Sequence, residues 1–385
     1  MVTGSIQQNQ GKYYAVLNLR DDLGNRKQKW VSMGLPVKNN RRKAEKRLED
    51  IKAQYSDDIY IAPDQTLFCD FIKDWVHASQ GRLQVTTYDV YNHMLDKHLF
   101  PYFKKSRVLL SNLTPATIQK YINDKLASDL SPNTVSKHYS IIRSVLQQAV
   151  KNTLIKSNPC DCVDKPKRKK FYGEYYNADE IKALLAVAKG TQLETAIYIA
   201  AYFGLRRSEV IGLRWDAIDF STKTLRVKHK VVRAKKDGKM ATYATDDLKT
   251  ESSYRTLPLD DTLVAYLQEL KQQQGANCGR NGNCHVHEYN DYVCVNELGN
   301  LINPDYVTDA FSKLLKKHNF KHIRFHDLRH SCASLLLALG YSMKDVQEWL
   351  GHSNYQTTAN LYGHVDPNNK RDMIQGITGA IGLVC

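Results

Sequence analysis

The chain's most reactive residue types gather near its C-terminus, where His326, Arg329, His352 and Tyr362 follow one another between residues 322 and 364. Histidine exchanges protons near neutral pH, arginine binds anionic oxygens through paired N–H donors, and tyrosine becomes a nucleophile in a positive environment. Each residue alone has an ordinary alternative as a helix cap, an ion-pair partner or a half-buried surface residue. As a set they are an unusual inventory for a protein core, and they could converge on one site.

Predicted helix ends bring these four groups toward one another. The apolar periodicity after His326 predicts a helix that ends at Gly340. A second helix, with a capping-box start, ends at Gly351 and presents His352 just beyond its cap. A third, short helix would carry Tyr362.

Two cations far upstream extend this set. Arg206 lies in a tight connection between two predicted helices, the second of which spans residues 210–215 with Ser208 as its cap. Lys249 lies in a predicted loop before a strand at residues 255–259. A lysine or arginine is by itself ordinary on any surface, so the significance of both depends on the whole set.

The composition points to a polyanionic partner. The chain has 385 residues, enough for two or three domains, and 55 Lys and Arg against 40 Asp and Glu leave a net charge of +15. Such a balance fits nucleic acid or an anionic membrane. No apolar run is as long as a bilayer-spanning helix, and the N-terminus lacks the apolar segment of a signal peptide. We therefore expect nucleic acid, and no membrane, as the partner.

The eight cysteines are too scattered in a chain of this length for a disulfide scaffold, so we expect reduced thiols in a cytosol. One cluster contains zinc-ligand types, namely Cys278, Cys284, His285, His287 and Cys294. Its first two cysteines lack the close Cys-x2-Cys spacing that usually orients a structural zinc site. We predict no metal and interpret residues 275–283 as a Gly/Asn-rich surface loop, with zinc as the alternative.

Residues 1–60 are expected to form a small separate domain. Strand patterns at residues 13–19 and 27–33 flank a turn-rich connection, and helical periodicity begins after residue 39. This pattern predicts a sheet of two or three strands covered by one helix. The candidate DNA-binding cations here are Arg20, Lys27, Lys29 and Arg41. The alternative is a solvated charged face.

Residues 64–164 are predicted to form an all-α domain. Thr114 and Ser131 each precede a proline, which is typical of a helix start. Residues 165–173 form a basic linker with no apolar period. Its candidate DNA-contacting residues are Lys167, Arg168, Lys169 and Lys170. A nuclear-localisation signal is a weaker interpretation of the same run.

The remaining chain, residues 174–375, is predicted to be mainly α-helical with a small antiparallel sheet. Asn177 and Glu180 form a capping-box start, and strand patterns occur at residues 224–232, 240–244 and 255–259. The fold class is therefore a multidomain chain: a small β-sheet plus helix at the N-terminus, an all-α central domain, and a mainly α third domain with a small sheet. Residues 376–385 form a short apolar tail.

The ordered set closely resembles the tyrosine recombinase (phage integrase) family, with a layout similar to integrases of conjugative transposons and temperate phages. The motifs that carry the resemblance are Arg206-Arg207-Ser208-Glu209, Lys249-Thr250, His326-x-x-Arg329, Gly351-His352 and Tyr362. The resemblance covers essentially the whole chain. It implies an arm-type DNA-binding domain at 1–60, a helical core-binding domain at 64–164 and a catalytic domain at 174–375.

The resemblance also implies a role for each residue. The arginines Arg206 and Arg329 would clamp the scissile phosphate, and Tyr362 would attack it to form a 3′-phosphotyrosine. In the same scheme His326 is the candidate base, Lys249 the general acid and His352 a hydrogen-bond donor to the phosphate. The intermediate conserves the phosphodiester energy, so we expect no cofactor: neither ATP nor metal is required, and the sequence contains no Walker motif or acidic metal cluster.

The implied partner is double-stranded DNA with core-type and arm-type attachment sites, on which the chain integrates and excises a mobile element. We further expect a homotetramer on DNA, docking of residues 377–384 on a neighbouring copy, and an excisionase or host DNA-bending protein as accessory factor. The expected location is the bacterial cytoplasm, at the nucleoid when DNA is bound. The alternatives are a type IB topoisomerase-like enzyme and a non-catalytic DNA-binding regulator.

Overall fold

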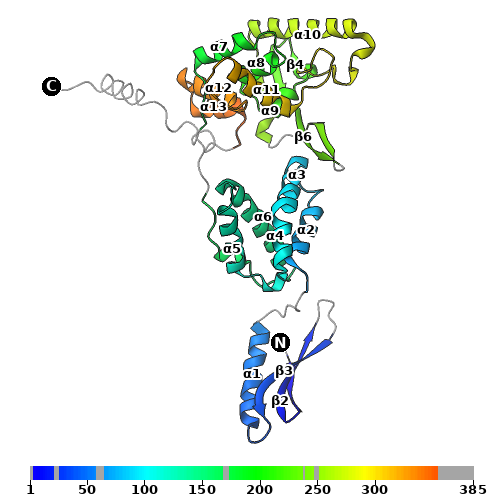
Figure 1. Ribbon diagram of the computed structural model, residues 1–385, viewed down its shortest axis with the longest axis vertical. Coiled ribbons are helices and arrows are strands. Elements are labelled where there is room, and N and C mark those ends of the chain that lie inside the picture. The colour runs from blue at the N-terminus through cyan, green and yellow to red at the C-terminus, as the bar shows by residue number, and fades with distance from the viewer. Residues whose placement is uncertain are drawn as a thin grey trace, which may run out of the picture. The chain divides into compact units, whose positions relative to one another are not determined.

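The computed structural model describes residues 3–20, 26–57, 65–167, 173–236, 239–246 and 251–353. The chain divides into two compact units, Met1–Lys169 and Lys170–Cys385 (Figure 1). The predicted fold class is confirmed: a sheet with one helix comes first, then a helical bundle, then a mainly α part with small sheets. In the described residues, no helix is long and apolar enough to cross a membrane.

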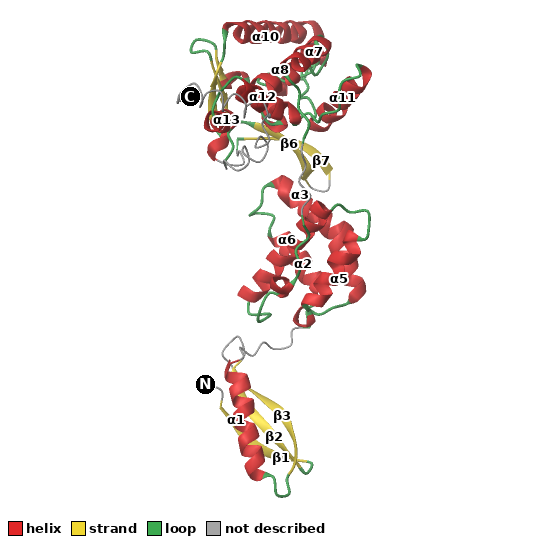
Figure 2. Ribbon diagram, turned by 90° about the vertical axis from the view of Figure 1, so that its left-hand side faces the viewer, coloured by secondary structure: helices red, strands yellow, loops and turns green. Residues whose placement is uncertain are grey.

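The N-terminal sheet has three antiparallel strands in sequential order, and one helix lies along it (Figure 2). These elements are β1 (Thr3–Asn9), β2 (Lys12–Arg20), β3 (Arg26–Pro36) and α1 (Arg41–Asp57). Alternate residues of β2 face the helix, because strand side chains point to opposite sides in turn. Ala15 and Leu17 therefore pack with Met33, Ala44 and Leu48 in one small core.

The following helices form a second core within the first unit. They are α2 (Phe68–Ala78), α3 (Val85–Met94), η1 (Leu95–Leu99), α4 (Phe100–Ser106), η2 (Leu110–Asn112), α5 (Pro115–Leu126), α6 (Pro132–Lys151) and η3 (Pro159–Cys162). The hydroxyls of Thr114 and Ser131 accept backbone N–H groups of Thr117 and Thr134, which confirms both predicted helix starts. The π-helical turn η1 precedes Pro101, whose missing N–H prevents a regular α-helical ladder.

The described part of the second unit consists mainly of helices, with two small antiparallel sheets. The α-helices among its described residues are α7 (Ala178–Ala188), α8 (Glu194–Phe203), α9 (Arg207–Ile211), α10 (Asp261–Asn281), α11 (Pro304–Lys317), α12 (Asp327–Ala338) and α13 (Met343–Leu350). Its short 3-10 helices there are η4 (Trp215–Ala217), η5 (Glu251–Ser253), η6 (Gly282–Cys284) and η7 (His287–Tyr289). One sheet has the order β4 (Ile218–Asp219), β5 (Thr224–Val227), β8 (Arg255–Pro258), and the other pairs β6 (Lys230–Lys236) with β7 (Lys239–Thr245). The buried helix α8 packs against α12, which also contacts α13.

Three local predictions need correction. The helix expected at 210–215 is α9, which begins at Arg207; Arg206 is its N-terminal boundary residue, and the carboxylate of Glu209 accepts the Arg206 N–H instead of Ser208 providing the cap. The strand expected at 224–232 is divided between β5 and β6, which belong to different sheets. The loop expected from residue 275 is the end of α10, which continues to Asn281.

Candidate active site

Two helix C-termini meet where the predicted residues gather. Gly204 ends α8 and Gly351 ends α13, and both adopt left-handed backbone angles, with φ of 59° and 67°. A Cβ on Gly204 would lie 2.5 Å from Cδ2 of Leu350, and one on Gly351 would lie 2.6 Å from the carbonyl oxygen of Ser252. Only glycine fits these positions. The partly negative carbonyl ends of both helices therefore face one small region.

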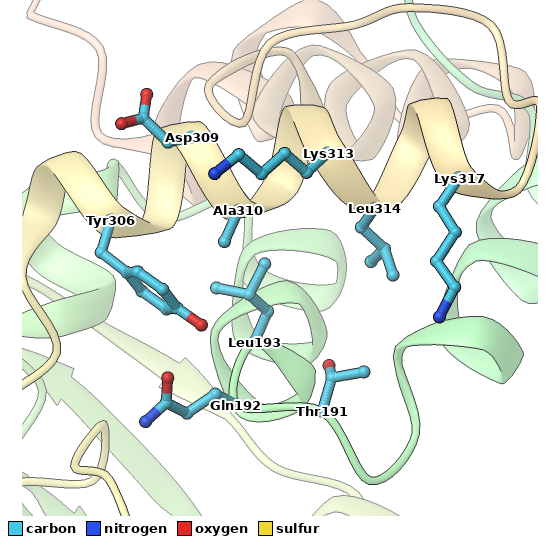
Figure 3. A pocket seen from close by; sticks show the side chains of 9 residues that line it. All are labelled: Thr191, Gln192, Leu193, Tyr306, Asp309, Ala310, Lys313, Leu314 and Lys317. Carbon is cyan, nitrogen blue, oxygen red and sulfur yellow. The ribbon is translucent and has the colours of Figure 1, made fainter.

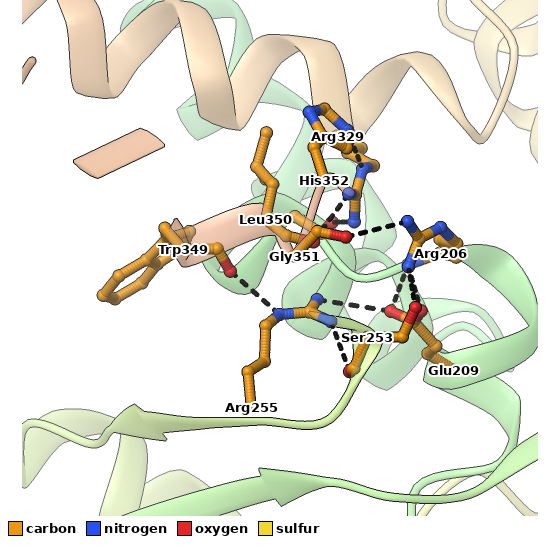
Figure 4. A network of polar contacts seen from close by, with 10 residues as sticks. Arg206, Glu209, Ser253, Arg255, Arg329, Trp349, Leu350, Gly351 and His352 are labelled. Atoms are coloured by element: carbon orange, nitrogen blue, oxygen red, sulfur yellow. Dashed lines mark hydrogen bonds and ion pairs between the residues drawn. The ribbon is translucent and has the colours of Figure 1, made fainter. Parts of the chain in front are cut away.

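Arg329 joins these two helix ends. Its Nη1 donates to the Gly204 carbonyl at 2.7 Å and its Nη2 to the Leu350 carbonyl at 2.6 Å, while Nε donates to Nε2 of His352 at 3.3 Å (Figure 4). The side chain is 1% exposed. A guanidinium has five N–H donors, so two remain for another acceptor after these contacts.

Arg206 approaches the same region from the start of α9. Its Nη1 pairs with Oε1 of Glu209 at 2.6 Å, and its Nη2 donates to the Gly351 carbonyl at 3.1 Å. Nη1 also lies 3.4 Å from the hydroxyl of Ser253. A quarter of this side chain is accessible to solvent, so Arg206 is the more open of the two predicted arginines.

A third arginine, which the sequence reasoning missed, completes the network. Arg255 at the start of β8 donates Nη2 to Oε2 of Glu209 at 3.2 Å and Nε to the Trp349 carbonyl at 2.8 Å. It therefore ties the strand to the end of α13. No local sequence signal marks this residue, because its partners lie far away in the chain.

The network carries an excess of positive charge. Among the described residues, Glu209 is the single carboxylate that contacts Arg206, Arg255 or Arg329. Burial by itself would raise the pKa of Glu209, but the guanidiniums of Arg255 and Arg206 hold that pKa below its usual value. Burial, together with the charge of Arg206, lowers the pKa of Arg329 to about 9. An anion bound here would relieve this electrostatic cost.

Two stretches of the chain match known protein families. Residues 174–369 match the phage integrase family, and residues 67–167 match the phage integrase SAM-like domain. The first match alone covers more than half of the chain. The chain belongs to the phage integrase family.

Among individual proteins, the integrase is similar to a XerC-like tyrosine recombinase of Caldanaerobacter subterraneus subsp. tengcongensis. The two are 29% identical over 292 residues, which are 72% of this chain and 75% of the relative. The predicted family, enzyme class and activity are thus confirmed: the chain is a tyrosine recombinase, an enzyme that recombines DNA.

Two solved structures share the fold. The Tn1549 transposon integrase in complex with transposon right end DNA has a TM-score of 0.67 and 18% identity, and the match covers 81% of this chain and 100% of that one. A lambda integrase tetramer bound to a Holliday junction has a TM-score of 0.54 and 16% identity, with 91% and 95% covered.

The two predicted histidines of the integrase lie beside the arginines. His352 is 9% exposed, and burial together with the charges of Arg329 and Arg206 lowers its pKa to about 3. His326, directly before α12, is an exposed residue, and the protein around its ring still desolvates it in part. This desolvation, with the nearby His330 and Arg329, lowers the pKa of His326 to about 4. Both rings are therefore neutral at physiological pH.

The low pKa of His352 predicts a loss of stability in acid. The ordinary pKa of histidine is 6.5, so His352 binds a proton in the unfolded chain as the pH falls below 6.5. In the folded chain it binds this proton only near pH 3. We expect the free energy of unfolding of the second unit to fall by up to about 1.4 kcal/mol per pH unit in this window because of His352. Denaturant titrations of wild type and His352→Gln between about pH 7 and about pH 4 measure this slope.

The matched control is His318→Gln, which removes an exposed histidine at the end of α11. It should leave the wild-type slope intact, whereas His352→Gln should flatten it. Equal slopes in all three proteins would contradict the buried, neutral state of His352.

Two predicted catalytic residues, Lys249 and Tyr362, lie outside the described residues. Ser253, which follows Lys249 closely in the sequence, contacts Arg206. The structure thus brings together Arg206, Arg329 and His352, with His326 close by.

The predicted DNA-binding cations of the N-terminal part do not all lie on one face of the sheet. Lys29 pairs with Leu17 in the sheet register, so it lies on the side that α1 covers and not on the open face. Arg41 is exposed and forms an ion pair with Glu45 at 3.4 Å, which contributes little to stability. Arg20 pairs with Arg26 at the end of the hairpin.

The remaining predicted cations sit at the strand end and in the linker. Lys27 pairs with Leu19, and the side chains of Lys27 and Arg20 lie outside the described residues. In the linker Lys167 is exposed, and Arg168, Lys169 and Lys170 lie outside the described residues.

A separate cavity of about 470 Å³ lies between the start of α8 and the helix α11 (Figure 3). Leu193, Ala310 and Leu314 form its apolar part, and Lys313 and Lys317 stand at its edge. None of its lining residues belongs to the arginine network. The cavity is therefore not part of the candidate active site.

Proposed function

We propose that this integrase cleaves and rejoins DNA at specific sites through Tyr362. The phenolic oxygen attacks the scissile phosphorus, a 3′-phosphotyrosine bond forms, and the bond to the 5′ oxygen breaks. The 5′ oxygen leaves with a proton from Lys249, and His326 accepts the phenolic proton. A 5′ hydroxyl from another strand then reverses the steps and restores the phosphodiester, so a mobile element is integrated or excised.

The paired arginines carry this proposal. Arg329 donates to the carbonyls of Gly204 and Leu350 at the ends of α8 and α13, and Arg206 donates to the carbonyl of Gly351. Each guanidinium still has N–H groups that can donate to phosphate oxygens. Rigid donors of this kind stabilise the charge that develops on nonbridging oxygens, and they need no reorganisation during the reaction. His352, kept neutral, accepts from Arg329 and can donate its other N–H to the phosphate.

A nicked suicide substrate tests the proposal. The attachment-site DNA comes from the ends of the element that encodes the chain, and the nick lets the short 5′ hydroxyl fragment diffuse away so that rejoining fails. We expect a covalent protein–DNA adduct that maps to Tyr362 by mass spectrometry of its peptides. If no adduct forms, the hypothesis of covalent cleavage is wrong, and a DNA-binding regulator is favoured. Relaxation of plasmids without strand exchange would favour the topoisomerase alternative.

Each of the three parts of the chain would have its own function, either catalysis or binding of one DNA site. We assign residues 174–375 to catalysis and residues 64–164 with the linker 165–173 to the core site, where the DNA is cut. Residues 1–60 would bind a second, arm-type site. The open face of the N-terminal sheet supports the last assignment, because it presents Trp30, which is 49% exposed, and the hydrogen-bonded amides of Asn18 and Gln28. Amide side chains can read adenine edges in the major groove.

Removing the amides should weaken arm-site binding selectively. We expect Gln28→Ala to lower the affinity for arm-type DNA by about 1–3 kcal/mol while cleavage at the core site is unchanged. Electrophoretic mobility shifts with arm-type and core-type duplexes measure the two affinities. The matched control is Lys52→Gln on α1, whose side chain pairs with Glu49. Equal binding by Gln28→Ala and wild type would exclude Gln28 from DNA recognition.

Recombination between two duplexes requires four active sites, and the lambda integrase neighbour forms a tetramer on a Holliday junction. We assign the same assembly to this integrase, with residues 377–384 docking on an adjacent copy. A chain truncated after residue 372 should still cleave the suicide substrate but lose DNA-bound tetramers, measured by light scattering. An excisionase or a host DNA-bending protein would set the direction of the reaction, which takes place on DNA in the cytoplasm.

A further inference from the structure

A second group of reactive side chains lies at the end of α10. Cys278 belongs to the last turns of this helix, and His285 and His287 follow in the next turn of chain. Each of the three offers one donor atom, and these atoms lie within 4.8 Å of one another. A thiolate and two imidazoles are ligands that zinc prefers.

The spacing within the group suits a tetrahedral metal ion. Sγ of Cys278 lies 3.8 Å from Nδ1 of His287, and the rings of His285 and His287 are 5.2 Å apart between centroids. Zinc bonds of ordinary length to sulfur and nitrogen, at a tetrahedral angle, place those two atoms about 3.6 Å apart. A small closure of the group therefore suffices.

One buried nitrogen of His285 has no hydrogen-bond partner among the described residues. It is Nδ1, in a residue that is 8% exposed. A thiol–imidazole hydrogen bond can explain the approach of Cys278 to His287, but it does not satisfy this nitrogen. Buried polar atoms are nearly always paired, so the unused lone pair of Nδ1 points to a missing ligand.

The surroundings hold the ring of His285 in place. Nε2 of His285 contacts Oδ1 of Asn290 at 2.9 Å. A hydrogen bond to one nitrogen of an imidazole fixes the other for metal binding. Gly299, with φ of 79°, packs so closely that a Cβ there would lie 2.6 Å from Nε2 of His285. The ring is therefore oriented before any metal arrives.

We propose that Cys278, His285 and His287 bind one zinc ion, with a water molecule in the fourth position. The ion would fasten the end of α10 to the loop that continues to Val293, whose N–H donates to the Leu213 carbonyl at 2.9 Å. It stabilises the catalytic domain and takes no part in DNA cleavage. In a sequence, a close pair of cysteines is the usual sign of a zinc site. In the structure, one cysteine lies beside two histidines instead.

Metal analysis of the full-length chain, purified without an affinity tag, tests the site. We expect about one zinc ion per chain, and Co²⁺ in its place should give the absorption of a thiolate-bound tetrahedral ion. Cys278→Ser should lose the zinc and the thiolate band. Asn290→Ala, which keeps all three ligands, should weaken zinc binding by about 10–100-fold. In zinc the wild type should melt at a higher temperature than Cys278→Ser, and in chelator the two should melt alike.

Cys284→Ser is the matched control, because Cys284 is an exposed cysteine beside the group that is not one of the three ligands. It should bind zinc as the wild type does. A chelator-treated wild-type chain that takes up no zinc on titration with Zn²⁺ alone would overturn the proposal. Retention of zinc by Cys278→Ser with loss in Cys284→Ser would overturn the ligand assignment.

Discussion

Replacing Tyr362 by phenylalanine is expected to abolish the covalent adduct while leaving DNA binding intact. The substitution removes a single oxygen, and no other tyrosine follows the Gly351-His352 motif at this spacing. Enzymes that lose their nucleophile lose roughly 10⁴-fold or more of their rate. Single-turnover cleavage of the suicide substrate, at protein concentrations that saturate the DNA, measures this loss separately from affinity.

The control for this substitution is Tyr341→Phe, which alters an exposed tyrosine, 55% accessible, shortly after α12. Because surface substitutions rarely change a free energy by more than about 0.5 kcal/mol, its cleavage rate should stay within about twofold of wild type. A full yield of adduct from Tyr362→Phe would mean that another residue is the nucleophile, and the peptide map of the adduct would then identify it.

Much of this site could be predicted because helix ends have sequence signatures. Gly340 and Gly351 mark helix termini through their need for left-handed angles, and Ser342 with Asp345 marks a start, as the capping box in the structure confirms. His352 and Arg329 lie next to these signals. The domain pattern was predictable for the same reason, since Thr114-Pro115 and Ser131-Pro132 encode local backbone preferences.

What remained hidden depends on contacts between distant segments. Arg255 meets Glu209 across 46 residues, and an arginine at the start of a strand has no local feature that distinguishes it. The grouping of Cys278 with His285 and His287 required the helix α10 to continue through two glycines, against their low helix propensity. Likewise, the register that turns Lys29 toward α1 depends on pairing with β2. Tertiary structure decided each of these.

The arginines connect fold and chemistry, and Arg329→Lys separates the two contributions. Lysine keeps the charge, but its single ammonium cannot reach the Gly204 carbonyl, the Leu350 carbonyl and His352 together in the planar geometry of a guanidinium. A buried carbonyl left without a donor costs about 1–3 kcal/mol, so we expect lower stability. We also expect cleavage to fall by roughly 10²–10³-fold, because donors to the phosphate are lost.

Arg207→Lys is the matched control for the arginine substitution. Arg207 is the neighbour of Arg206, but it donates to the Pro304 carbonyl at 2.9 Å and contacts Thr308, outside the network. Its variant should lose some stability and keep its cleavage rate at saturating DNA. If Arg329→Lys lost stability and cleaved at the wild-type rate once folded, Arg329 would be a structural tie between α8 and α13, and Arg206 alone would bind the phosphate. Loss of cleavage in folded Arg329→Lys, with Arg207→Lys active, assigns the clamp to both arginines.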